Sequence, residues 1–175
     1  MKYFFYFALI SLFLACGKNQ EKPSLPENYW GEASAERNGK PWATNPVCWI
    51  NIVNKTNVII ELDSFINNYY LKESLIIFDI PPFLGTYKVN KLTAAKDLNS
   101  SLSMWDADLS IGGYTLLESD SNTNRVTLTS YDTLSKEIKG TFNLTYIVVP
   151  PGPYPDYPDT IRFRNGKFHG KLIKK

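Results

Sequence analysis

The chain has 175 residues, of which 19 are Lys or Arg, 17 are Asp or Glu and one is His, so its net charge is +2. A charge so close to zero argues against nucleic acid as a partner. The length that remains beyond the N-terminal segment is that of one ordinary domain.

Residues 1–15 have the pattern of a secretory signal peptide. Lys2 precedes a run of about thirteen apolar or aromatic residues, and the small residue Ala15 stands before Cys16. The apolar run is too short to cross a bilayer, which takes roughly 20 residues. We therefore expect this segment to direct export and not to belong to the fold.

The four residues Phe13-Leu14-Ala15-Cys16 resemble the lipobox of bacterial lipoproteins, with Phe13 where a leucine is usual. The resemblance implies cleavage before Cys16 and acylation of its thiol, with chains such as palmitate, and several acyl chains anchor a protein stably to a membrane. Gly17 stands where an aspartate would retain a lipoprotein at the inner membrane. The expected location is therefore the outer membrane, on its periplasmic side or at the cell surface.

Residues 16–28 are predicted to form a lipidated, flexible tether, because they are polar and include two prolines. Once Cys16 is acylated, Cys48 has no partner for a disulfide and is expected to be a buried thiol. With His169 as the one histidine, the sequence offers no catalytic residues, no metal site and no cofactor site.

Residues 29–175 are predicted to be a single β domain, because apolar and polar residues alternate along most of it. The predicted strands cover residues 29–37, 46–53, 58–65, 74–80, 85–89, 103–111, 114–118, 125–131 and 137–149. Asn38-Gly39 and Gly112-Gly113 are predicted turns. Residues 91–98 are the one helix candidate, because their apolar residues have roughly helical spacing.

The last stretch is predicted to be a β-hairpin that closes the fold. Asn165-Gly166 between alternating residues is a strong signal for a two-residue turn. One face of this hairpin is expected to join the core with Ile161, Phe163, Phe168 and Leu172. The opposite face is basic, with Arg162, Arg164, Lys167, His169 and Lys171.

About ten short strands with turns between them and almost no helix predict an all-β fold. The expected arrangement is an antiparallel meander that forms either a barrel or a sandwich. Alternation on the predicted strands fits sheets with one face in water. Gly140, inside the longest strand, indicates a bend, a bulge or a close packing neighbour.

Four motifs occur in order along the domain: Arg37–Trp42, Gly85–Tyr87, Ile138–Phe142 and Arg164–Phe168. Together they resemble a family of small, functionally uncharacterised lipoproteins of Gram-negative bacteria with an all-β, lipocalin-like domain. The resemblance implies the location and the fold class, and it carries no activity over to particular residues.

Two pairs of carboxylates are the only residues that suggest catalysis or cation binding. Asp106 and Asp108 share one face of a predicted strand, and Glu118 and Asp120 have the same spacing. Such pairs serve glycosidases or calcium sites, but a solvated hairpin face explains them equally well.

The proline-rich stretch 150–159 is the candidate ligand-binding segment. Tyr154 and Tyr157 are three residues apart, so in a polyproline helix their rings would point the same way and suit stacking on a sugar or a peptide. Alternatively, the stretch is a stiff connection packed across the mouth of a barrel.

These features predict a non-enzymatic, membrane-anchored module that binds a small apolar molecule inside a barrel or an envelope glycan at its loops. The alternative is a structural or accessory lipoprotein that docks a partner protein. A carboxylate-dependent glycan enzyme is less favoured.

Overall fold

The structure is a computed structural model that describes residues 24–51, 56–91, 98–150 and 157–173. The signal peptide, Cys16, Tyr154 and most of the predicted helix lie outside these ranges. Within them, no helix is both long enough and apolar enough to cross a membrane.

Ten strands and one short 3₁₀ helix make up the described chain. They are β1 (Gly31–Arg37), β2 (Lys40–Ile50), β3 (Val58–Ile66), β4 (Tyr70–Ile80), β5 (Gly85–Lys88), β6 (Asn99–Asp106), β7 (Leu109–Leu116), η1 (Glu118–Asp120), β8 (Arg125–Tyr131), β9 (Glu137–Val148) and β10 (Thr160–Ile173). The all-β prediction is confirmed.

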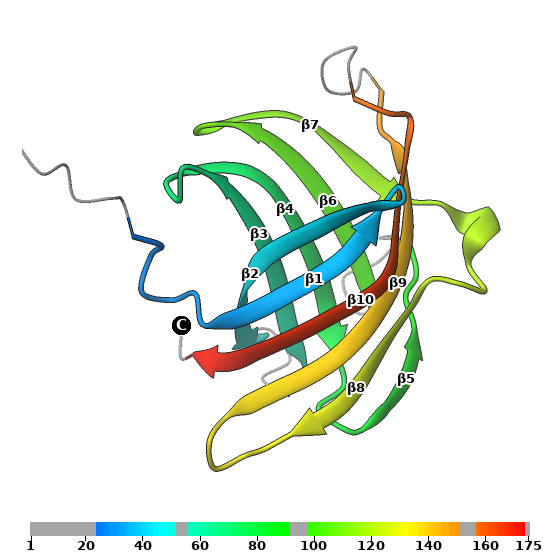
Figure 1. Cartoon of the computed structure of the whole chain (residues 1–175). Coiled ribbons are helices and arrows are strands. Elements are labelled where there is room, and N and C mark those ends of the chain that lie inside the picture. Colours follow the sequence, from blue (N-terminus) through cyan, green and yellow to red (C-terminus); the bar gives the residue numbers. More distant parts are fainter. Residues whose placement is uncertain (1–23, 52–55, 92–97, 151–156, 174–175) are drawn as a thin grey trace, which may run out of the picture.

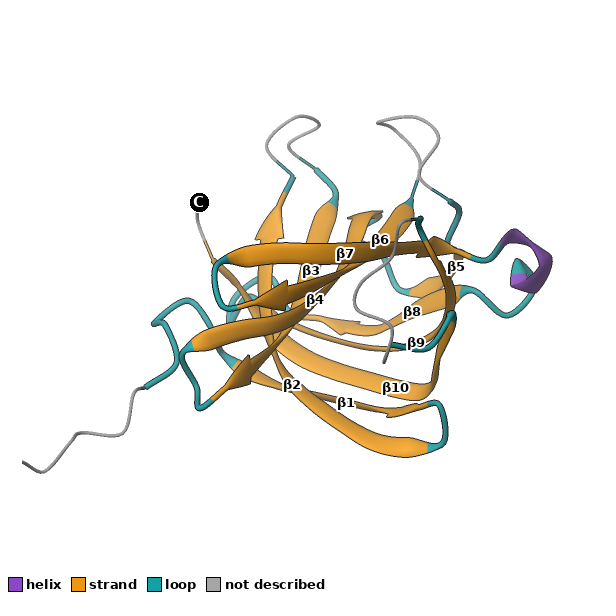
Figure 2. Cartoon of the chain, turned by 90° about the horizontal axis from the view of Figure 1, so that it is seen from above, coloured by secondary structure: helices purple, strands orange, loops and turns teal. Residues whose placement is uncertain are grey.

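Eight of the strands close into an antiparallel barrel in the order β1-β2-β3-β4-β6-β7-β9-β10, with β10 paired back to β1 (Figures 1 and 2). Because β1 begins only at Gly31, β10 continues past it and pairs directly with β2 through Leu172 and Ile173, in parallel. The barrel, one of the two arrangements expected, is therefore the fold.

The long strand β9 has two successive neighbours on one edge. Its C-terminal part pairs with β7, and its N-terminal part pairs with β8. Strand β5 adds to the outer edge of β8, and a parallel bridge between Asn90 and Asn99 links its end to β6. Strands β8 and β5 thus continue the sheet beside the N-terminal part of β9, where β7 does not pair with it.

The barrel interior is filled by large side chains. An eight-stranded barrel is just wide enough for side chains or for one small ligand. Tyr146, Phe142 and Phe163 are all fully buried. The ring of Phe163 meets that of Trp42 from β2 at 4.9 Å and that of Tyr146 at 6.1 Å between centroids. Aromatic side chains from β9, β10 and β2 therefore pack together inside the barrel.

The predicted hairpin at Asn165-Gly166 is wrong. Strand β10 runs through both residues, and Asn165, with φ of 54°, forms a β-bulge that shifts the register against both β9 and β1. The extra residue changes which positions point inward. The predicted core face, with Phe163 before the bulge and Phe168 after it, is nevertheless buried.

The predicted strand 103–111 and the turn at Gly112-Gly113 are also wrong. Strand β6 ends at Asp106, Ala107 and Asp108 form the turn, and β7 runs through both glycines. Ala107 has a positive φ of 55°, a conformation that alanine seldom adopts and that sequence alone gives little reason to expect.

Candidate functional site

A groove runs along the outer face of β1, between β2 and β10. Ala33 and Ala35 point into the barrel, so the residues between them point outward. We call this feature the β1 groove. Its main part has a volume of about 590 Å³, and the outward residues that line it are Glu32, Ser34, Ala43, Asn45, Lys167 and His169. A second hollow of about 430 Å³ continues it past Glu36 to Asn165.

The depth of the β1 groove follows from the sizes of paired side chains. Ser34 lies opposite Ala43 of β2, so the floor is made of two small residues. On the other side Ser34 lies opposite Lys167, and Glu32 lies opposite His169. Long side chains of β10 therefore form one wall beside a low floor.

One end of the groove carries an aromatic ring and a fixed histidine. Nε2 of His169 lies 3.0 Å from Oε2 of Glu137. The ring of Trp30 meets the His169 ring edge to face at 5.1 Å, and Lys171 Nζ lies 5.6 Å from the Trp30 ring centroid. Trp30 remains 39% exposed, so part of this ring faces solvent.

The other end of the groove is closed by a hydrogen bond between β10 and β1. Asn165 Nδ2 donates to Oε1 of Glu36 at 3.3 Å. The positive φ of the bulge presents the Asn165 side chain here. Between these two ends, Lys167 and Asn45 offer hydrogen-bond donors to the groove, and Glu32 offers hydrogen-bond acceptors.

The proline-rich segment is only partly described. Tyr157 is half-buried and packs against the hydrophobic core, and the hydroxyl of Tyr114 donates to the carbonyl of Pro158 at 2.9 Å. Tyr154 lies outside the described residues, so the alignment of the two tyrosine rings stays a prediction.

The paired carboxylates occupy separate places. Asp106 ends β6 and Asp108 lies in the exposed turn that follows, so the two do not share one strand face as expected. Asp120 of η1 lies 3.6 Å from Arg164. Within the described ranges, no three His, Cys, Asp or Glu residues gather closely enough to hold a metal ion.

A buried carboxylate lies inside the barrel at the end of the β1–β2 turn. Glu73 is 2% exposed. It accepts a hydrogen bond from Trp42 Nε1 and pairs with Arg37 Nη2 at 3.3 Å. Both carboxylate oxygens thus have partners, as a buried charge requires. Sequence reasoning missed this cluster, because its residues come from three strands and no local pattern connects them.

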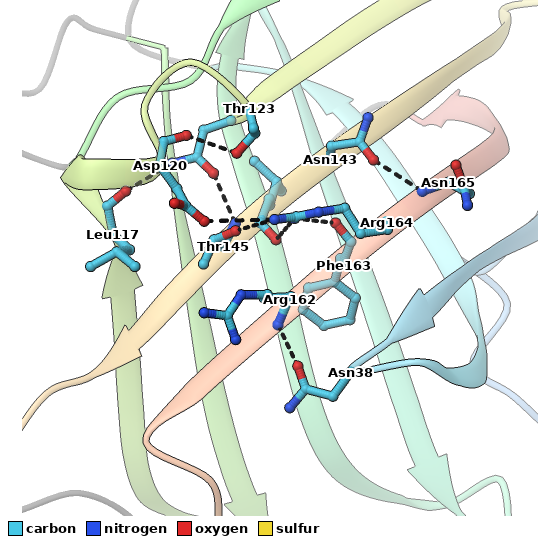
Figure 3. A network of polar contacts seen from close by, with 12 residues as sticks. Asn38, Leu117, Asp120, Thr123, Asn143, Thr145, Arg162, Phe163, Arg164 and Asn165 are labelled. Atoms are coloured by element: carbon cyan, nitrogen blue, oxygen red, sulfur yellow. Dashed lines mark hydrogen bonds and ion pairs between the residues drawn. The ribbon is translucent and has the colours of Figure 1, made fainter.

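A network of polar contacts fastens the η1 segment to β9 and β10 (Figure 3). Arg164 Nη2 donates to Thr145 Oγ1 at 2.9 Å, and Asp120 lies beside the same guanidinium. Thr145 lies between the part of β9 that pairs with β8, which ends at Asn143, and the part that pairs with β7, which begins at Tyr146. Asn124 replaces a strand there: its Oδ1 accepts the Thr145 N–H at 2.8 Å, and its Nδ2 donates to the Leu117 carbonyl at 3.2 Å.

Comparison of the chain with known protein families, curated proteins and solved structures finds no match. The class of the protein therefore follows from its own fold and surface. It is a closed, all-β barrel with extra strands, a core of buried side chains and an open groove on its outer wall that is lined by charged, polar and small residues.

Proposed function

We propose that the protein is a membrane-anchored, non-enzymatic binding module that holds a glycan of the cell envelope in the β1 groove. The observation that carries the proposal is the composition of the groove. Its mixed hydrogen-bond donors and acceptors stand over a floor of small residues, and the part-exposed ring of Trp30 lies against His169 at one end.

The chemistry of the groove matches that of a sugar chain. Hydroxyl groups both donate and accept hydrogen bonds, and Lys167 and Glu32 offer one of each kind. The apolar face of a sugar ring suits stacking on an aromatic ring such as Trp30. From Trp30 to Glu36 the strand extends about 20 Å at roughly 3.3 Å per residue, which is long enough for several sugar units.

The filled interior favours the glycan over the small apolar molecule that the sequence also suggested. A carrier barrel needs space between its walls, and here the buried rings of Phe163, Trp42 and Tyr146 pack together inside it. A ligand inside would have to displace these rings. The outer groove requires no such rearrangement.

Binding is tested with the protein purified from membranes in detergent, titrated with soluble peptidoglycan fragments and with the core oligosaccharide of lipopolysaccharide. We expect one of them to bind, and Trp30→Ala to weaken binding at least tenfold. Phe83→Ala, which removes an exposed ring outside the groove, is the matched control and should bind normally. If neither glycan binds, or if both variants bind as the native protein does, the groove is not the site.

The membrane anchor is tested separately. Mass spectrometry of the N-terminal peptide should find acyl chains on Cys16, and Cys16→Ser should release the protein from the membrane fraction. A mature protein whose Cys16 carries no acyl chain would remove the anchor from the proposal and leave the groove hypothesis standing.

A further inference from the structure

Four exposed apolar side chains gather at one rim of the barrel. Ile66, Tyr69 and Tyr70 belong to the β3–β4 hairpin, and Leu109 follows the β6–β7 turn. Tyr69 and Leu109 are each 66% exposed. We call these four residues the apolar rim. Scattered apolar residues on a surface are ordinary, but a contiguous group marks a contact site.

The two hairpin tips lie side by side. Glu73 of β4 pairs with Met104 of β6, close to the end of the hairpin on each side. Figures 1 and 2 both show the tips together on the same side of the barrel. Ile66 and Tyr70 are direct cross-strand partners, and the Tyr69 and Tyr70 rings are 4.8 Å apart.

The turn that presents these rings has a defined shape. Asn67 and Asn68 both have positive φ, at 55° and 59°, a conformation that asparagine tolerates better than most residues. The Tyr69 N–H donates to the Ile66 carbonyl at 3.2 Å. Tyr69 is therefore held at the apex of the hairpin with its ring in solvent.

The N-terminal segment reaches the barrel beside this rim. The ring of Tyr29 meets that of Phe65 at 5.2 Å, and its hydroxyl donates to Asp63. Phe65 is the residue before Ile66. Ser24, where the described chain begins, follows Cys16 by eight positions, so even a fully extended chain separates the two by at most about 28 Å.

We propose that the apolar rim rests in the interfacial layer of the membrane to which the tether is anchored. The inference builds on the proposed anchoring at Cys16. A tether this short keeps one side of the barrel near the bilayer, and the side where it leaves carries the rim. Tyrosine and leucine side chains are those that settle at the boundary between head groups and acyl chains.

The charges around the rim define the kind of lipid it suits. Asp106 and Asp108 lie at the β6–β7 turn and Lys72 lies on β4, all three exposed. Two carboxylates against one ammonium give no attraction to an anionic surface. The rim therefore fits a zwitterionic lipid surface.

The contact is tested by site-specific fluorescence on vesicles of zwitterionic phosphatidylcholine. Single cysteines in place of Tyr69, Leu109 and Leu134 carry an environment-sensitive probe. Leu134 is the matched control, because it is 93% exposed at the β8–β9 turn, at the opposite end of the barrel in Figure 1. Cys48 is buried and does not take up the probe.

Each protein is attached to vesicles in two ways: through its own acylated Cys16, or through a histidine tag in place of Cys16 that binds a nickel-chelating lipid. We expect nitroxide-labelled lipid to quench the probes at Tyr69 and Leu109 at least threefold more than the probe at Leu134. The tag arm gives this result even if Cys16 is not acylated in the cell, so failure of the anchor and failure of the rim are distinguishable.

Equal quenching at all three positions would overturn the proposal. So would a requirement for anionic lipid, or a probe signal at Tyr69 that rises with protein concentration in the absence of vesicles, since the latter indicates contact between copies of the chain. Thermal unfolding of each labelled protein within a few degrees of the native protein establishes that the barrel is intact.

Discussion

At the residue scale, the Asn124 side chain makes the hydrogen bonds that a neighbouring strand would otherwise make with the backbone. The backbone of β9 at Thr145 falls in the gap between two sheet neighbours, and an unpaired buried N–H costs about 1–3 kcal/mol. Asn124 supplies the acceptor for this N–H and a donor for the carbonyl of Leu117. Aspartate could not supply both, because an ionised carboxylate only accepts.

Replacing Asn124 with alanine is expected to lower the free energy of unfolding by about 2–3 kcal/mol, because the buried Thr145 N–H and the part-buried Leu117 carbonyl lose their partner. Urea denaturation measures the change. Asn143→Ala is the control: its Oδ1 also accepts a backbone N–H, from Asn165, but in an exposed place. A loss below about 1 kcal/mol is expected there, and equal losses would refute the assigned role of Asn124.

Cys48 is a second residue whose surroundings decide its behaviour. It is fully buried, and burial raises the pKa of its thiol to about 12. Since the thiolate is the nucleophile, the native protein with Cys16 acylated or replaced by serine should not react with a disulfide reagent at pH 8. One thiol should react after unfolding in urea. Ser110→Cys, at an exposed position, should react at once in the folded protein.

At the element scale, the chain uses one tetrapeptide in two ways. Arg37–Lys40 forms the turn between β1 and β2, where Asn38 and Gly39 both have positive φ, at 51° and 77°. Arg164–Lys167 has the same four residues and forms a bulge inside β10, where only Asn165 does so. The difference is set by partners: β10 has β1 on one side and β9 on the other, so the strand continues.

Strands β9 and β10 pack closely because two glycines leave room for aromatic rings from the opposite strand. Phe168 pairs with Gly140, and Phe142 pairs with Gly166. A Cβ added at Gly140 would lie 2.4 Å from the Phe168 ring, and one at Gly166 would lie 2.6 Å from the Phe142 ring. The close packing neighbour expected at Gly140 is thus confirmed, and each ring covers the bare backbone of the opposite strand.

Gly140→Ala is expected to destabilise the protein by about 2 kcal/mol or more, because the methyl group overlaps both the Phe168 ring and the Thr127 carbonyl. Thermal or urea unfolding measures this loss. Gly113→Ala is the matched control inside β7, where the nearest atom, the Leu102 carbonyl oxygen, would be at 3.5 Å. A similar loss in both variants would show that overlap is not the cause.

At the scale of the whole molecule, the folded barrel keeps several tyrosine hydroxyls and the Cys48 thiol protonated to a higher pH than the unfolded chain does. Burial is the largest cause that raises the pKa of Tyr29, Tyr114 and Tyr146. Hydrogen bonding to the Asp63 carboxylate raises that of Tyr29 further. In the unfolded chain a tyrosine loses its proton near pH 10 and a cysteine near pH 8.5.

Stability should therefore fall as the pH rises above about 9, since the unfolded state then releases protons that the folded state keeps. Below this range the contribution of these groups is fully present. The urea midpoint at pH 7.5 and at pH 10.5 measures the effect. Tyr29→Phe should reduce the decline, whereas Tyr69→Phe, at an exposed ring, should not. A midpoint that does not change with pH would contradict the prediction.

The sequence by itself determined the properties that depend on near neighbours. Alternation placed the inward residues of β9 correctly, and Asn38-Gly39 marked a true turn, because both signals act over two to four residues. It also pointed to the buried residues of β10, although it assigned them to a hairpin.

The tertiary structure alone decided which strands pair and where the surface is hollow. The β1 groove combines Glu32 and Ala43 of the β1–β2 hairpin with Lys167, which is distant along the chain and meets them only because β10 closes on β1. Small outward residues such as Ser34 and Ala43 are the one local signal that could have suggested it. Barrel closure, the bulge at Asn165 and the Glu73–Arg37 pair all depend on long-range register, which local alternation does not encode.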